Sequence, residues 1–170
     1  MIVTKGNFYE CVQAIGEESF ISMDTETTGL NPYLDDRLFG ISISTANNDY
    51  YFNFNVGTVN CLSYSYIPYI IFNKACTIFM HNAKFDLAFL FKEGLNLLDY
   101  TIHDTIIGAR LIHSDLPRYS LDALTGKKDN TVEKYITKNK LWTKINYDGK
   151  KDDNLDRQRR HNQDETAIHL

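Results

Sequence analysis

Hydrophobic and polar residues alternate along several short stretches of this chain, a pattern typical of half-buried β-strands. An Asn-Asn-Asp turn signal at 47–49 separates two of these stretches, because Asn and Asp tolerate left-handed backbone. The strands that we predict cover residues 20–26, 38–45, 50–54, 76–80 and 98–103. The first three follow one another closely in the chain, so we expect them to pair as an antiparallel meander.

Other stretches place apolar residues three or four positions apart, which predicts helices. The clearest covers residues 83–93, and Gly94 is suited to end it because glycine readily adopts left-handed backbone. Ser120 is the expected N-cap of a short helix that ends at Leu124. Further helices are predicted over residues 64–73, 105–113 and 154–170.

The order of these elements, strands first and then alternating helices and strands, predicts an α/β protein with a mixed sheet. A length of 170 residues favours one domain over 1–170, within which the lysine-, asparagine- and aspartate-rich residues 126–160 form a polar excursion. The apolar pattern of the last helix stops abruptly at Leu170. We therefore expect the chain to be excised from, or fused to, a longer polypeptide.

Composition narrows the function classes further. Hydrophobic residues make up 43% of the chain and charged residues 24%, a globular balance with no apolar run long enough to span a bilayer. The N-terminus lacks a secretory signal, and Cys11, Cys61 and Cys76 have no paired spacing, so we expect free thiols in the cytoplasm. A net charge of −4 argues against a wide duplex-binding surface, although acids that hold metal ions can still meet nucleic acid.

Two acids at the end of the first predicted strand carry the sharpest chemical signal. Asp24 and Glu26 are two residues apart, and side chains alternate along a strand, so both carboxylates point the same way. Burying them without a partner would cost several kcal/mol, which a divalent cation would offset. Oxygen ligands favour Mg²⁺ or Mn²⁺. The alternative is an exposed strand end at a turn.

Three further acids lie in comparable positions. Asn82 and Asp86 follow a predicted strand and open a helix, where open α/β sheets place their sites. Asp104 has the same context, and Asp164 lies on the predicted last helix, on one face with Arg160 and His161. The alternatives are a plain N-cap for Asn82 and for Asp104, a plain N-terminal helix acid for Asp86, and a solvated polar helix face for Asp164.

Taken together, these motifs resemble the DEDD superfamily of 3′→5′ exonucleases. The likeness rests on DTETTGL at 24–30, HNAKFDLAFL at 81–90, HDTIIGARLI at 103–112, YSLDALTGK at 119–127 and a late acid. Within the superfamily, the chain is most similar to the proofreading exonuclease domain of family A (DNA polymerase I-like) DNA polymerases, phage-type. The similarity runs from about residue 17 to 126, and thinly to 170.

This resemblance implies an RNase H-like (DnaQ-like exonuclease) fold and assigns roles to residues that match the motifs. Two divalent cations, Mg²⁺ or Mn²⁺, would be held by Asp24, Glu26, Asp86 and Asp164, with Asp24 bridging the pair. Glu165 is the alternative to Asp164 for the last acid. The positions that contact the terminal nucleotide or its phosphates in relatives are Thr25, Leu30, Asn82 and Phe85. Leu30 and Phe85 are equally compatible with a core role.

The implied activity is metal-dependent hydrolysis of single-stranded or frayed DNA 3′ ends to nucleoside 5′-monophosphates, as in polymerase proofreading. We expect a monomer in the cytoplasm, that of the host if the protein is phage-encoded, with a DNA polymerase module in cis or trans and no membrane contact. Two alternatives stay open. One is a catalytically silent scaffold or DNA-binding domain, and the other is an RNA-directed exoribonuclease of the same superfamily.

The last motif departs from the family pattern. Relatives place a Tyr four residues before the final Asp, or a His five before it, to orient the attacking water. Here those positions hold Arg160 and Arg159, and arginine stays protonated. We therefore predict that His161, which titrates near neutrality, or Arg160 orients the water or the scissile phosphate.

Overall fold

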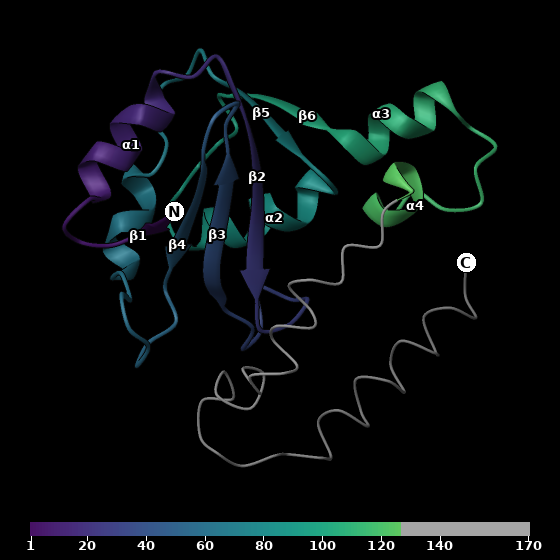
Figure 1. The fold of residues 1–170 in the computed structure, drawn as a ribbon. Helices are drawn as coiled ribbons and strands as arrows, with labels where there is room; N and C mark the ends of the chain where they lie inside the picture. The colour runs from purple at the N-terminus through teal and green to yellow at the C-terminus, as the bar shows by residue number, and fades with distance from the viewer. Residues whose placement is uncertain (127–170) are drawn as a thin grey trace. The chain divides into compact units, whose positions relative to one another are not determined.

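A six-stranded mixed sheet forms the centre of the computed structural model, which describes residues 1–126 (Figure 1). The strand order is β1-β4-β3-β2-β5-β6. The strands are β1 (Ile2–Val3), β2 (Phe20–Thr27), β3 (Leu38–Ser44), β4 (Asp49–Asn53), β5 (Thr77–Met80) and β6 (Thr101–Asp104). Nearly all of the predicted polar excursion and the predicted last helix lie outside the described residues, and the assignment of 1–170 to one domain stays a prediction.

The predicted meander is confirmed, because β2 pairs with β3 and β3 pairs with β4, both antiparallel. The remaining pairs, β1 with β4, β2 with β5 and β5 with β6, are parallel. Because β2, β5 and β6 run parallel, their carboxyl ends lie on the same side of the sheet. This side is where an open α/β sheet builds its sites.

Five helices accompany the sheet within residues 1–126: α1 (Phe8–Gly16), η1 (Tyr64–Tyr69), α2 (Ala83–Lys92), α3 (Thr105–Ile112) and α4 (Leu121–Thr125). The end of α2 follows the prediction, since Gly94 has a φ of 89° and donates its N–H to the Phe91 carbonyl at 3.1 Å. The helix predicted over 64–73 is instead a 3₁₀ helix that ends at Tyr69. Pro68 lies inside it and has no N–H for a helical hydrogen bond.

The sequence interpretation missed the elements before residue 20. Helix α1 buries Phe8, Cys11, Val12 and Ile15, a spacing of three and four residues that marks a helix facing the core. Strand β1 contributes two residues and pairs with β4, so its alternation is too short to recognise in the sequence.

Alternation along the strands separates two faces of the sheet. On the first face, Ile21 and Met23 of β2 join Ile41 and Ile43 of β3 in one hydrophobic core with the buried sides of α1 and α2. The second face carries Ser22, Asp24, Ser42, Ser44 and Phe79. The core therefore fixes β2 rigidly while the intervening residues project from the opposite side.

Two expectations from composition can be compared with the described residues. Cys11, Cys61 and Cys76 are free thiols, as expected. Within residues 1–126, no helix has the length and apolar character needed to cross a membrane.

Candidate active site

The carboxyl-terminal half of β2 places both acids of the first motif on the second face. Asp24 lies opposite Ser42 of β3, and Glu26 lies opposite Gly40. Thr25, between them, points to the other side of the sheet and is only 7% exposed. The prediction that Asp24 and Glu26 share a face therefore holds. A register irregularity follows directly, between Glu26 and Thr27.

Asp86 is hydrogen-bonded to Thr25 of the same strand. It lies in the first turn of α2 and is 2% exposed, unlike an ordinary solvated acid at a helix start. Its Oδ1 accepts two hydrogen bonds from Thr25, one from the backbone N–H at 3.0 Å and one from the hydroxyl at 2.6 Å. These bonds join motifs that lie 61 residues apart in the chain.

The three acids sense one another electrostatically. Burial raises the pKa of Asp86 to about 6, and the charge of Asp24 adds to the increase while the Thr25 hydrogen bonds oppose it. Burial also raises the pKa of Glu26, followed by the charges of Asp24 and Asp86. Desolvation raises the pKa of Asp24, and a hydrogen bond with the Thr25 backbone and then the charge of His81 oppose the increase. A site that disfavours its own negative charge in this way is suited to a cation.

The described residues do not by themselves form a metal site. Among residues 1–126, no three His, Cys, Asp or Glu side chains are grouped so that they could hold an ion together. One oxygen of Asp86 is occupied by Thr25, which leaves its second oxygen and the carboxylates of Asp24 and Glu26. Asp164, which the sequence adds to this set, lies outside the described residues.

Asp104 has a structural role at the neighbouring strand end. Its carboxylate accepts the N–H of Ile106 at 2.9 Å, which caps α3. The same carboxylate accepts the N–H groups of Asn82 at 3.2 Å and Ala83 at 2.9 Å, at the start of α2. The N-cap alternative for Asp104 is therefore confirmed, and one acid aligns two helix starts beside the site.

The residues that the resemblance assigns to the substrate lie in different environments. Leu30 is 69% exposed, and Asn82 is exposed with a φ of 71° and makes no capping hydrogen bond with its side chain. Phe85 is half-buried against Phe89, with ring centroids 5.2 Å apart. The Thr25 side chain is buried against Asp86. Arg160 and His161 lie outside the described residues.

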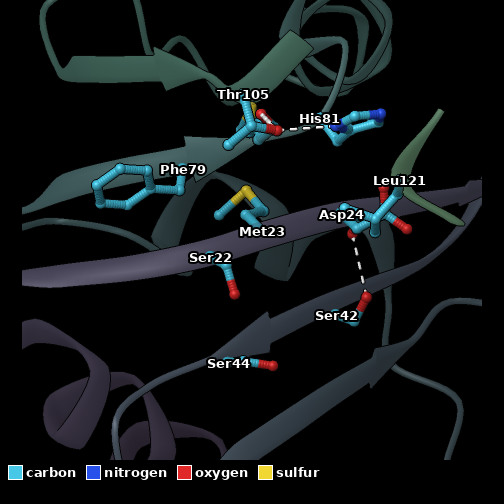
Figure 2. Close-up of a pocket in the computed structure, with 10 residues that line it drawn as sticks. Ser22, Met23, Asp24, Ser42, Ser44, Phe79, His81, Thr105 and Leu121 are labelled. Atoms are coloured by element: carbon cyan, nitrogen blue, oxygen red, sulfur yellow. Dashed lines mark hydrogen bonds between the residues drawn. The ribbon is translucent and has the colours of Figure 1, made fainter. Parts of the chain in front are cut away.

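An open pocket of about 540 Å³ lies on the second face and reaches Asp24 (Figure 2). His81 and Thr105 border it, and the His81 Nδ1 atom lies 2.8 Å from the Thr105 hydroxyl. Thr105 donates to the Met80 carbonyl, so its oxygen accepts the Nδ1 proton of His81. Among the described side chains, His81 Nε2 is the one buried polar atom without a hydrogen-bond partner. The sequence interpretation gave His81 no role, although it begins the second motif.

Comparison with known proteins places these features in a family. A family model described as 3′–5′ exonuclease matches residues 1–155. DNA polymerase DpoZ of Acinetobacter phage SH-Ab 15497 is 36% identical over 118 residues, which cover 66% of this chain and 18% of the polymerase. DNA polymerase DpoZ of Salmonella phage PMBT28 is 33% identical over 109 residues, or 64% of this chain and 17% of the polymerase. The chain thus spans less than a fifth of either curated relative.

Solved structures share the fold at lower sequence identity. Escherichia coli RNase D, an exoribonuclease involved in structured RNA processing, matches with a TM-score of 0.58 at 17% identity, over 78% of this chain and 35% of that one. Brucella melitensis NrnC with bound Mg²⁺ matches with a TM-score of 0.50 at 21% identity, over 72% of this chain and 56% of that one. These similarities agree with the expected RNase H-like fold.

Proposed function

Because this chain belongs to the 3′–5′ exonuclease family of the DEDD superfamily, in the branch found with family A DNA polymerases of phages, we propose that it removes nucleotides from DNA 3′ ends with the help of two divalent cations. The observation that carries this proposal is the bonding of Asp86 to Thr25. It brings the second motif against the strand that presents Asp24 and Glu26.

The donor set fits Mg²⁺ or Mn²⁺ because it consists of carboxylate oxygens, and their mutual repulsion is relieved by a bound cation. Asp24, Glu26, the second oxygen of Asp86, and Asp164 would hold the ions. A divalent pair, when bound, stabilises the charge of the attacking and leaving oxygens. Asp24 and Glu26 face the substrate side from a rigid strand. The hydrogen bond from the Thr25 hydroxyl holds the Asp86 carboxylate in place.

The substrate that we propose is a single-stranded or frayed DNA 3′ end, released as nucleoside 5′-monophosphates during proofreading. The two phage relatives are named as DNA polymerases, which supports DNA over RNA. Leu30 and Asn82, whose side chains are exposed, would contact the terminal nucleotide together with Phe85. An apolar or aromatic contact accepts any base, as proofreading requires.

Digestion of matched DNA and RNA oligonucleotides by the 170-residue chain tests this proposal. With Mg²⁺ or Mn²⁺ we expect DNA to be shortened faster than RNA, nucleoside 5′-monophosphates as products, and no digestion in EDTA. Faster digestion of RNA would transfer the assignment to an exoribonuclease. No digestion of either with any metal would support the catalytically silent module.

Three variants test the acid and the base assigned beyond residue 126. Asp164→Asn should abolish digestion if this acid completes the metal site, whereas loss of digestion in Glu165→Gln instead would assign that role to Glu165. His161→Ala should slow digestion if this histidine orients the water. Digestion of single-stranded DNA by His161→Ala at the parent rate would remove that role.

A further inference from the structure

A tyrosine from the third strand of the meander extends toward the acids of the second face. Tyr51 of β4 alternates with the core residues Tyr50 and Phe52, so its side chain is on the same face as Asp24. Strand β3 lies between β4 and β2 (Figure 1). An ordinary β3 side chain would separate Tyr51 from the acids.

At Gly40, β3 has no side chain that would separate Tyr51 from the acids. A Cβ atom built on Gly40 would overlap the Tyr51 hydroxyl oxygen and lie 2.8 Å from Cζ of the ring. The end of the tyrosine ring therefore occupies the space that a side chain at position 40 would fill. Glycine at this position is what allows Tyr51 to cross β3.

Gly40 is directly opposite Glu26 in the antiparallel register of β3 and β2. Side chains in that relation have Cβ atoms about 5 Å apart. The Tyr51 hydroxyl thus takes the position of the cross-strand neighbour of Glu26. A phenol keeps its proton at neutral pH and can donate it to a carboxylate.

We propose that Tyr51 is a positioning residue whose hydroxyl, passing over Gly40, is placed to donate a hydrogen bond to the Glu26 carboxylate when that carboxylate binds a divalent cation. This inference rests on the proposed function. It also bears on the departure in the last motif, where Arg160 stands in place of the family's tyrosine. Tyr51 of β4 would bring a phenol to Asp24 and Glu26 from a different part of the fold.

Mn²⁺ binding to the 170-residue chain, measured by calorimetry without nucleic acid, tests the role of Tyr51 directly. Tyr51→Phe removes only the hydroxyl, and we expect Mn²⁺ affinity to fall about 10–100-fold, the usual loss for a group that orients a metal ligand. The single-turnover digestion rate should fall to a similar extent. Tyr50→Phe, whose side chain is on the core face, is the matched control and should bind Mn²⁺ within about twofold of the parent.

Gly40→Ala provides an independent test. The added methyl group displaces the end of the Tyr51 side chain, while Tyr51 and Glu26 themselves are not substituted. We expect the same loss of Mn²⁺ affinity. Combining Gly40→Ala with Tyr51→Phe should cause no further loss, since both changes remove one hydrogen bond. Losses that multiply in the double variant would overturn the proposal, as would a Tyr51→Phe chain that binds Mn²⁺ like the parent.

The metal titration separates this proposal from the function on which it rests. A parent chain that binds Mn²⁺ but digests neither DNA nor RNA overturns the proposed function, while the titration of Tyr51→Phe still decides the role of the tyrosine. A parent chain that binds no Mn²⁺ overturns both.

Discussion

Replacing Asp86 with asparagine removes a charge from the interior while keeping the shape of the side chain and an oxygen that can accept from Thr25. Asp86 is 2% exposed, and its burial raises its pKa from 3.8 to about 6. At 1.36 kcal/mol per pKa unit, this increase corresponds to about 3 kcal/mol of unfavourable free energy for the ionised group in the folded chain. We therefore expect Asp86→Asn to be more stable than the parent at pH 7 without metal, by up to about 3 kcal/mol.

The difference in unfolding free energy between the parent and Asp86→Asn depends on pH. A carboxyl group with a raised pKa in the folded state stabilises the fold below its unfolded pKa, and this stability is lost as the pH rises through the folded value. The parent should therefore lose stability relative to Asp86→Asn between about pH 3.8 and pH 6. Below this range the two chains should be nearly equal, and above it the difference should be constant.

Urea unfolding followed by circular dichroism, in EDTA at several pH values, measures this difference. Asp35→Asn, at an exposed site, is the control and should match the parent at every pH. The reasoning fails if Asp86→Asn is no more stable than the parent at pH 7, or if its advantage persists at pH 3.5. Added Mn²⁺ should stabilise the parent more than Asp86→Asn, because the carboxylate is then a ligand.

Three further substitutions test the Thr25–Asp86 hydrogen bond and the packing around two glycines. Thr25→Val removes the hydroxyl that donates to Asp86, so we expect a loss of about 1–3 kcal/mol in urea unfolding at pH 7; unchanged stability would show that this bond contributes nothing. Gly29→Ala places a methyl group against the buried Asp36 carboxylate and should lower the unfolding free energy by at least about 1 kcal/mol. Gly108→Ala, in open space within α3, should instead raise it by about 0.5–1 kcal/mol. If both glycine variants shift stability in the same direction, the packing explanation is wrong.

The sequence predicted the sheet and the two faces of β2 well because those features depend on local alternation. Asp24 and Glu26 share a face for the same reason, and the α2 boundary follows from Gly94. The prediction omits the first helix, although the spacing of its buried residues from Phe8 to Ile15 marks one face toward the core.

Contacts between distant segments were beyond the reach of sequence patterns. Alternation along β2 predicts that the Thr25 side chain points into the core. Only the packing of α2 shows that its hydroxyl donates a hydrogen bond to Asp86. Likewise, Tyr51 and Gly40 carry no motif of their own. Their relation to Glu26 depends on the register of three strands, which turn signals do not determine to within one residue.

The most direct test of the central claim, that acids of β2 and α2 hold the cations for hydrolysis of 3′ ends, is digestion of a 5′-labelled single-stranded DNA under single-turnover conditions. With Mg²⁺, the parent should give a ladder that shortens one nucleotide at a time from the 3′ end, and Asp24→Asn should leave the strand intact. A ladder that persists in EDTA, or at the parent rate in Asp24→Asn, would contradict the claim.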